Sequence, residues 1–367
     1  MARLGTSAEV SEVMWAAPEP AVRERPGDDW DESSIILGIE TSCDETSAAV
    51  LRGEREILSN VIASQDELHG EYGGIVPEIA ARAHVEALTP VVREALLRAD
   101  VTFWDIDAVA CTLGPGLIGS LLVGVAEAKA IAAVLDAPFA GVNHLEAHIY
   151  STLLADPEAS FPAVALIISG GHTLLVSARA HGDYEVLGGT IDDAAGEAFD
   201  KVARFLGLGY PGGPEIDRLS LLGDPDAVEL PRSMLAEEGF DVSFSGLKTA
   251  VINYVRKVEA AGEEVPVADI AASFQQAVVS VQVAKTVAAT RHAGVDRVFL
   301  CGGVAANSGL RQGLQEACDQ RSLRLHTPPL ELCTDNAAMV AACAAAMLRR
   351  GRYTSLEVAP DPNLPLI

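Results

Sequence analysis

The chain has few aromatic residues and few lysines. Phe, Tyr and Trp make up 5% of its 367 residues, so Ala, Val and Leu must build the core, which suits helices packed closely on sheets. Acidic residues number 52 against 26 basic ones, for a net charge of −26. A chain with this charge repels polyanions at long range, which argues against direct nucleic-acid binding unless a local basic patch or a partner overrides it. High acidity also simply favours solubility.

Paired cysteines, long apolar runs and an apolar leader are missing as well. The six cysteines are scattered without a CxxC pair, which indicates free thiols in a reducing compartment, so we expect a cytoplasmic protein. No apolar stretch is typical of a membrane span; the most apolar long segment, 337–348, is short and alanine-rich and predicts a buried helix. Residues 1–34 lack the apolar region of a signal peptide and predict a disordered acidic tail.

Strand-like and helix-like segments alternate through the rest of the chain. This alternation predicts an α/β fold with largely parallel sheets flanked by helices. The length favours two domains, and we place their boundary near 155–162. The predicted domains are 35–158 and 159–367, with a C-terminal helix that can pack back on the first domain.

Two parts of the sequence share one plan. A short apolar strand, a polar turn and a second strand occur over 35–51 and again over 163–178. Two such openings in one chain suggest an internal duplication.

Two histidines, His144 and His148, stand four residues apart in a segment predicted to be helical. On a helix, this spacing places both imidazoles on one face, where they can reach one cation. Glu146 lies between them and points elsewhere. The zinc-protease pattern has the order His-Glu-x-x-His, so the order found here counts against a protease. Two ordinary, partly buried histidines are an equally acceptable interpretation of the spacing.

A cation held by two histidines needs a further ligand, and Asp335 is a candidate. Asp335 stands directly before the alanine-rich helix. Thr334 or Asp335 is also a natural N-cap for that helix, and the sequence alone cannot connect residue 148 with residue 335.

Three glycine-bearing turns could approach a phosphate closely. They are 169–173, 211–214 and 302–303, where glycine exposes backbone N–H groups without a Cβ. One glycine pair is usually only a turn, but three in an α/β chain favour nucleotide binding. None matches the Walker or GxGxxG patterns.

An acidic segment and a lysine complete the candidates. Asp192 and Asp193 precede a predicted helix and can cap it, while Glu197 and Asp200 lie one turn apart and could reach ribose hydroxyls or a cation. Lys248 follows a Ser-Gly turn and could meet an anion or simply be solvated.

Together these segments resemble the motifs of the TsaD/Gcp family, in order and without large gaps from residue 35 onward. The matching segments are 38–47, 69–78, 143–148, 169–173, 192–200, 244–248 and 302–307.

The resemblance implies the actin-like ATPase (ASKHA) fold, with two RNase-H-like lobes and a nucleotide cleft between them. It also implies transfer of a threonylcarbamoyl group from threonylcarbamoyl-AMP to N6 of adenosine 37 in tRNAs reading codons that start with A. His144, His148 and Asp335 match the family's metal ligands, for iron or sometimes zinc. The positions that match its nucleotide contacts are Ile167, Ile168, Ser169, Gly170, Gly171, Asp200, Gly213, Asp217 and Asn307.

The resemblance further implies tRNA, a TsaB-like paralogue and a TsaE-like ATPase as partners, and no membrane. The sequence reveals no nucleophilic triad. The group that takes the N6 proton stays open between His172 and Glu45, with neither favoured. The alternatives are an ATP-dependent small-molecule kinase of the same superfamily and a non-catalytic nucleotide-binding scaffold.

Overall fold

The computed structural model describes residues 30–366, and the contacts within it divide the chain into two compact units. Among the described residues, unit 1 contains those up to Ala63, Pro77–His144 and Asn336–Leu364, whereas unit 2 contains Ser64–Val76, Leu145–Asp335, Pro365 and Leu366. The predicted domain boundary after residue 158 stays a prediction, because proximity does not show which segments fold independently.

The predicted N-terminal tail, 1–34, lies outside the described residues except for its last five. Within those five, Trp30 is buried and its indole Nε1 donates a hydrogen bond to Tyr353 Oη at 3.1 Å. The end of the tail at residue 34 stays a prediction; the large apolar surface of Trp30 is covered by the same unit.

The sheet of unit 1 has the strand order β3-β2-β1-β4-β5. Strands β1 and β2 form the predicted antiparallel hairpin, while β1, β4 and β5 run parallel. Strand β1 is buried along its whole length. This burial agrees with its nearly continuous apolar sequence, which is typical of a central strand covered on both faces. The bounds are β1 Ile35–Glu40, β2 Glu45–Arg52, β3 Glu56–Ser64, β4 Ala108–Gly114 and β5 Phe139–Asn143.

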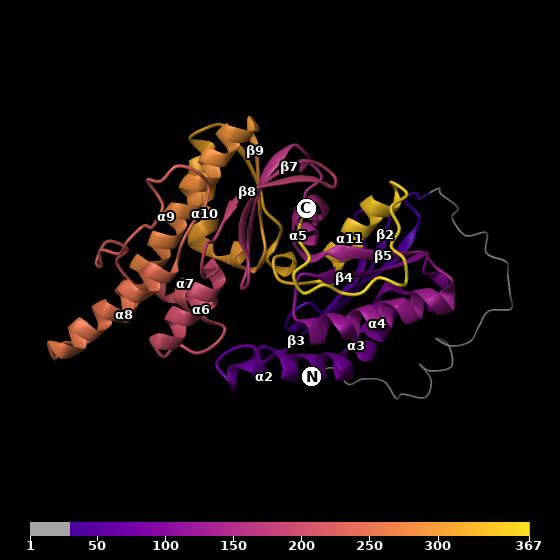
Figure 1. Ribbon diagram of the computed structural model, residues 1–367, viewed down its shortest axis with the longest axis horizontal. Coiled ribbons are helices and arrows are strands. Elements are labelled where there is room, and N and C mark those ends of the chain that lie inside the picture. The colour runs from indigo at the N-terminus through magenta and orange to yellow at the C-terminus, as the bar shows by residue number, and fades with distance from the viewer. Residues whose placement is uncertain (1–29, 367) are drawn as a thin grey trace. The chain divides into compact units, whose positions relative to one another are not determined.

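Helices cover this sheet on its two faces (Figure 1). Helices α3 and α4 contact each other and pack on β2 and β4, whereas the alanine-rich α11 packs on β1, β2, β4 and β5. The bounds are α3 Pro77–Ala99, α4 Ile118–Leu135 and α11 Ala337–Leu348, with a short 3₁₀ helix, η1, at Phe103–Asp105.

The sheet of unit 2 repeats the plan of the first. Its strand order is β8-β7-β6-β9-β10, again with an antiparallel opening hairpin, β6-β7, followed by the parallel pairs β6-β9 and β9-β10. This agreement confirms the predicted internal duplication. The bounds are β6 Ala163–Ile168, β7 Thr173–Ala180, β8 Asp183–Gly189, β9 Arg297–Cys301 and β10 Arg324–His326.

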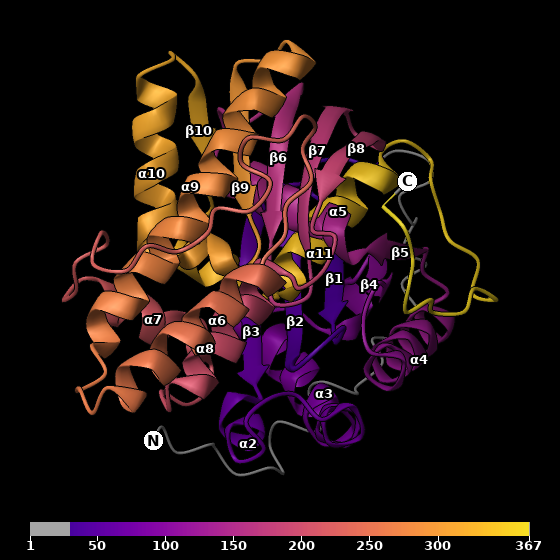
Figure 2. The same cartoon turned by 60° about the vertical axis from the view of Figure 1, so that its left-hand side comes forward.

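The core of unit 2 is formed by side chains of β6, β7 and β9 together with those of helices α6 to α10. Figure 2 shows the ribbons of α9 and α10 beside this sheet. Helix α9 runs through this core and packs against α7 and α10. The helices are α2 Asp66–Gly70, α5 His144–Ala155, α6 Ala195–Phe205, α7 Gly212–Ser220, α8 Ser245–Ala260, α9 Val267–Ala293 and α10 Ser308–Asp319, with 3₁₀ helices η2 Gly303–Ala306 and η3 Leu330–Leu332.

Two helices, α4 and α9, are long and apolar enough to cross a membrane by length and composition alone. Each of them also buries side chains within its own unit, among them Leu121 and Val125 of α4 and Phe274 and Val278 of α9. Core helices of globular proteins commonly have this composition.

The close approach of α11 to β1 generates a prediction about Gly38. A Cβ at this position would lie 2.4 Å from the carbonyl oxygen of Ala337, so we expect Gly38→Ala to lower the free energy of unfolding by about 1–3 kcal/mol. The matched control is Gly246→Ala, whose Cβ would lie 3.7 Å from Ser233 Oγ. Urea denaturation measures the stability of both variants. Without a steric conflict, alanine is more stable than glycine inside a strand. Unchanged or higher stability of Gly38→Ala would therefore contradict the tight packing.

Candidate functional site

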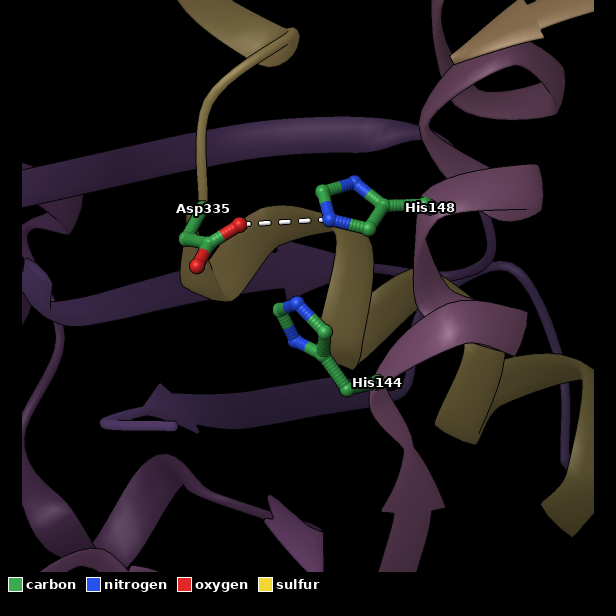
Figure 3. A group of neighbouring side chains, drawn as sticks. All are labelled: His144, His148 and Asp335. Carbon is green, nitrogen blue, oxygen red and sulfur yellow. Dashed lines mark ion pairs between the residues drawn. The ribbon is translucent and has the colours of Figure 1, made fainter. Parts of the chain in front are cut away.

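Helix α5 carries the predicted pair of histidines. His144 is its first residue and His148 follows one turn later. His148 is fully buried, and its Nε2 lies 3.2 Å from Oδ1 of Asp335. Figure 3 shows the rings of both histidines and the Asp335 carboxylate directed toward a common space. Residues 148 and 335, which the sequence could not connect, are therefore neighbours.

Asp335 does not cap the helix that follows it. The N-cap of α11 is Asn336, whose side-chain oxygen accepts a hydrogen bond from the backbone N–H of Met339 at 3.0 Å. The prediction that Thr334 or Asp335 is the N-cap was therefore wrong, because the cap lies one or two residues later, at Asn336. Because Asn336 supplies the cap, the carboxylate of Asp335 is directed at His148 instead.

A fully buried carboxylate, Glu40, supports His144 from the end of β1. Its Oε2 lies 3.2 Å from His144 Nδ1 and accepts the hydroxyl proton of Thr112 at 2.6 Å, while the backbone N–H of Ser42 donates to Oε1. The Ser42 hydroxyl makes a second contact with the same Nδ1, also at 3.2 Å. Because an ionised carboxylate only accepts hydrogen bonds, an ionised Glu40 would accept one from Nδ1–H of His144 and leave the lone pair on Nε2.

The donor set fits a divalent transition metal. One ligand atom from each of His144, His148 and Asp335 can be chosen so that all three lie within 4.8 Å of one another. Two imidazoles and one carboxylate form a ligand set used by zinc and by non-haem iron. The contact of His144 with Glu40 is the carboxylate support that metal-binding histidines commonly have.

The predicted nucleotide contacts all lie in unit 2, beginning at the end of β6. Ile167 and Ile168 end that strand, and 169–171 form the turn before β7. A Cβ on Gly170 or Gly171 would meet no atom within 4 Å, so these two glycines border open space. Strands β6 and β9 run parallel and end at the same edge of the sheet, the edge at which α/β folds bind ligands.

The beginnings of two helices meet this loop region. Asp200 on α6 accepts a hydrogen bond from the N–H of Gly212, the first residue of α7, at 2.8 Å. Asp217 on α7 accepts the N–H and hydroxyl protons of Ser308, the first residue of α10, at 3.1 and 2.8 Å. Gly213 has no atom within 4 Å of a would-be Cβ. These bonds fix the start of α7 against α6 and the start of α10 against α7.

Asn307 is held at both ends of its amide. Its oxygen caps α10 by accepting from the N–H of Leu310 at 2.9 Å, and its nitrogen donates to Oε1 of buried Gln275 at 2.7 Å. Gln275 in turn donates to the hydroxyl of Ser220 at 2.8 Å. This network places Asn307 firmly beside the α10 N-terminus. Gln275 itself was missed in the sequence, because nothing in its neighbourhood on α9 distinguishes it from a core residue.

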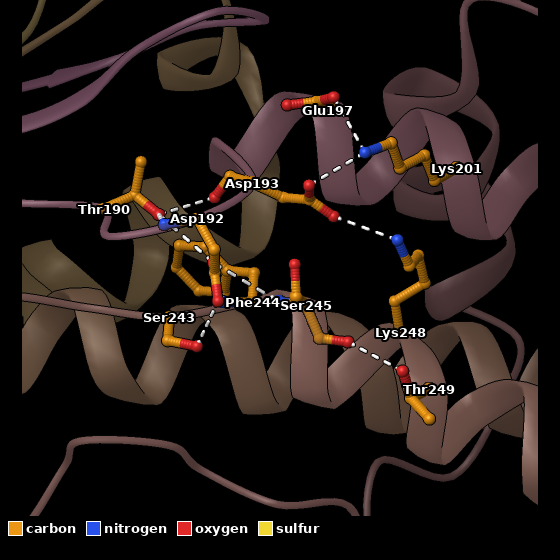
Figure 4. Close-up of polar contacts among 10 residues, drawn as sticks. All are labelled: Thr190, Asp192, Asp193, Glu197, Lys201, Ser243, Phe244, Ser245, Lys248 and Thr249. Carbon is orange, nitrogen blue, oxygen red and sulfur yellow. Dashed lines mark hydrogen bonds and ion pairs between the residues drawn. The ribbon is translucent and has the colours of Figure 1, made fainter.

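The acidic segment works differently from the predicted capping role (Figure 4). Helix α6 has Ala194 as its N-cap without a side-chain bond. Asp192 instead accepts hydrogen bonds at the start of α8, from the Ser243 hydroxyl at 2.6 Å and the Phe244 N–H at 2.9 Å. The prediction that Asp192 or Asp193 caps the following helix is wrong, because the loop folds back on α8.

Asp193 binds two of the chain's five lysines. Its carboxylate accepts from Lys201 at 2.8 Å and from Lys248 at 3.2 Å, and Lys201 also pairs with Glu197 at 2.8 Å. Burial acts to raise the pKa of Asp193, but the two lysines outweigh it and hold that pKa below the ordinary value of 3.8. Lys248 thus meets a carboxylate of the same unit, which accounts for its position without an external anion.

Other residues could not be found from the sequence. In the sequence, Glu40 stood out only as part of a motif. Its contact with His144 joins residues that are 104 positions apart, so no local pattern could reveal it.

The two candidates for the general base belong to different elements. Glu45 is at the start of β2 and His172 is in the turn before β7, and the choice between them stays open.

Comparisons with known proteins identify close relatives. A family model described as TsaD, tRNA N6-adenosine threonylcarbamoyltransferase, matches residues 56–342. A Symbiobacterium thermophilum protein with that enzyme name is 55% identical over 332 residues, which cover 90% of this chain and 97% of the relative. A Geobacillus thermodenitrificans protein with the same name is 52% identical over 340 residues, covering 92% and 99%.

Solved structures with low sequence identity share the fold. HypF from T. kodakarensis has a TM-score of 0.59 at 16% identity and covers 88% of this chain and 48% of its own. Component A of the Acidaminococcus fermentans (R)-2-hydroxyglutaryl-CoA dehydratase has a TM-score of 0.52 at 17% identity, covering 86% and 99%. These likenesses confirm the predicted α/β fold of the actin-like ATPase class.

The lysine pair on Asp193 predicts an acid-sensitive contribution to stability. Since the pKa of Asp193 is lower in the folded chain, its stabilising effect is present above the unfolded value and is lost as the pH falls below about 3.8 toward the folded pKa. We expect Asp193→Asn to lower the free energy of unfolding by about 1–2 kcal/mol at neutral pH. The difference in stability between this variant and wild type should shrink as the pH falls below about 3.8. Urea titrations over this pH range measure it.

The matched control for Asp193→Asn is Glu215→Gln, which breaks the exposed pair with Arg218 and should change stability little at any pH. A stability difference for Asp193→Asn that does not vary with pH would contradict the role of the charge.

Proposed function

Because this chain belongs to the TsaD family of tRNA N6-adenosine threonylcarbamoyltransferases, we propose that it transfers threonylcarbamoyl from threonylcarbamoyl-AMP to N6 of adenosine 37 in tRNAs. The substrate tRNAs would be those reading codons that start with A. The observation that carries the proposal is identity above 50% over nearly the whole length of relatives with this enzyme name. It supports an acyltransferase over a small-molecule kinase or a non-catalytic scaffold.

The reaction joins the N6 nitrogen to the carbamoyl carbon and breaks the bond from that carbon to the phosphate oxygen of AMP. The N6 lone pair is delocalised into the adenine ring, which makes the amine a weak nucleophile. AMP is a good leaving group, so no covalent enzyme intermediate is required. The released N6 proton passes to a base, for which His172 and Glu45 remain candidates. The chain must therefore position the two substrates and stabilise the charge that develops on oxygen.

We propose that the AMP part binds at the loops of unit 2. The open backbone of Gly170, Gly171 and Gly213 offers N–H groups to a phosphate. Asp200, Asp217 and Asn307 would contact the nucleotide from positions that their hydrogen bonds fix. Ile167, Ile168, Ser169 and Gly213 complete the proposed contacts.

We propose further that His144, His148 and Asp335 hold one divalent metal ion, with iron preferred to zinc. Bound there, such an ion would supply Lewis-acid stabilisation of negative charge on the carbamoyl or phosphate oxygens. An ionised Glu40 would keep the proton on Nδ1 of His144, so that Nε2 is available as a ligand. Asn336 keeps the cap of α11, so that Asp335 is available as well.

The partners would be tRNA, a TsaB-like paralogue and a TsaE-like ATPase, in the cytoplasm and without a membrane. The charge of −26 supports a role for a partner in tRNA binding, because a chain this acidic lacks the electrostatic attraction on which nucleic-acid affinity largely depends.

The metal proposal predicts the effect of removing a ligand. His148→Ala and Asp335→Ala should each lower the affinity of the metal-free chain for Fe²⁺ by at least about 100-fold and abolish transfer to tRNA. Isothermal titration under anaerobic conditions measures the first effect, and an assay with supplied threonylcarbamoyl-AMP measures the second. His292→Gln, on the C-terminal turn of α9, is the control.

If the alanine variants kept full activity without bound metal, the metal proposal would be wrong. A small-molecule kinase of the same fold would work without the histidine pair, so the same variants separate the two functions.

The charge argument predicts how tRNA is bound. At physiological salt, we expect the chain alone to bind tRNA at least about tenfold more weakly than its complex with the TsaB-like paralogue. Fluorescence anisotropy with labelled tRNA across a salt series measures both affinities. Tight binding of tRNA by the chain alone would contradict the proposal that a partner contributes to the tRNA-binding surface. A labelled acidic protein used in place of tRNA controls for non-specific association.

A further inference from the structure

The face of α5 that lies opposite the histidines is held by two polar contacts. Successive residues of an α-helix are rotated by about 100°, so Glu146 lies about 200° from both His144 and His148. Tyr150 stands one turn after Glu146, on the same face. The two contacts therefore act on the helix from the side away from Asp335.

The first contact joins α5 to β8. The hydroxyl of Tyr184 donates a hydrogen bond to Oε1 of Glu146 at 2.9 Å, and both residues are buried, with exposed fractions of 6% and 9%. A carboxylate is rarely placed in such surroundings, because its desolvation is costly unless hydrogen bonds compensate for it. Packing alone therefore does not explain why an acidic residue occupies this position.

The second contact joins α5 to the turn between β7 and β8. The hydroxyl of Tyr150, which is 4% exposed, lies 2.6 Å from Nδ1 of His181, and the two rings are 5.6 Å apart. Phe161 packs edge-on against His181 and also touches Tyr184, at ring separations of 4.9 and 6.3 Å. The same aromatic side chain thus supports both partners of α5.

We propose that the contacts Glu146–Tyr184 and Tyr150–His181, here called the α5 clamp, fix the rotation of α5 about its axis and thereby position His148 opposite Asp335. The inference rests on the metal site of the proposed function. It makes Glu146, Tyr150, Tyr184 and His181 positioning residues for metal binding, and it assigns a role to the acidic residue between the two histidines.

The geometry explains why rotation matters. A turn of α5 by about 10° would move a side-chain tip roughly 6 Å from the helix axis by about 1 Å. Metal and catalytic groups must be held within about 0.5 Å of their working positions. The His148–Asp335 separation of 3.2 Å is therefore sensitive to small rotations, which two contacts one turn apart can resist.

The test titrates the metal-free chain with Co²⁺, whose visible absorption bands report the coordination geometry. We expect Tyr184→Phe and Tyr150→Phe each to weaken Co²⁺ binding by about tenfold and to shift these bands. Each variant keeps the aromatic ring, and circular dichroism of the metal-free chain checks its fold. The control is Tyr353→Phe, which removes a tyrosine hydrogen bond with Trp30 in unit 1.

A second pair of variants separates position from charge. Glu146→Gln retains an oxygen that accepts the Tyr184 hydrogen bond, so its Co²⁺ affinity should stay within about threefold of wild type, whereas Glu146→Leu should lose about tenfold or more. If Glu146→Gln bound Co²⁺ as weakly as Glu146→Leu, the charge of Glu146 would be responsible for the effect, and the positioning role would be overturned. Wild-type affinity and unshifted bands in both tyrosine variants would overturn it too.

These results are distinguishable from failure of the metal site itself. If wild type bound no Co²⁺, or bound it as well after His148→Ala, the metal proposal would fail. Tight wild-type binding that depends on His148 but not on the tyrosines would overturn the α5 clamp alone.

Discussion

The contact between His148 and Asp335 is the constraint on which the arrangement of the site depends. A fully buried imidazole beside a carboxylate is costly to desolvate unless the pair is held in good geometry or shares a cation. The chain meets this requirement with neighbouring residues of ordinary chemistry. Asn336 takes the capping role that Asp335 would otherwise fill, and the carboxylate of Glu40 contacts Nδ1 of His144. The arrangement of the three side chains is therefore specified by these supporting residues as well.

The loops of unit 2 follow a different physical logic, in which backbone groups replace charged side chains. Basic residues are scarce, and Lys201 and Lys248 are bound to Asp193. A phosphate at the end of β6 would therefore depend on N–H groups of glycine turns. This explains why aspartates at 200 and 217 can stand in such a region: they bind the first N–H groups of α7 and α10 and set the direction of those helices.

Local patterns predicted the elements well but could not supply their partners. The hairpins at 35–51 and 163–178 and the helical spacing of His144 and His148 follow from apolar periodicity and turn residues, which are local properties. The neighbours of those residues are not local, since Glu40 meets residue 144 and Tyr184 meets residue 146 only after the sheets have formed. The capping predictions failed for the same reason. Asp192 satisfies a helix start 52 residues further along the chain instead of the helix that follows it, so proximity in sequence was misleading.

The shared plan of the two sheets places residues of different chemistry at equivalent positions. Strands β1 and β6 occupy the same position in their sheets, and each ends at a polar turn before an antiparallel partner. At the end of β1 the side chain is Glu40, a buried carboxylate that supports an imidazole. At the end of β6 the apolar Ile168 is followed by open glycines that leave the backbone accessible. Because the strand positions are equivalent, the difference in chemistry comes from the last residue of each strand and from the turn that follows it. The carboxylate of Glu40 contacts an imidazole, whereas the glycines after Ile168 leave the backbone accessible.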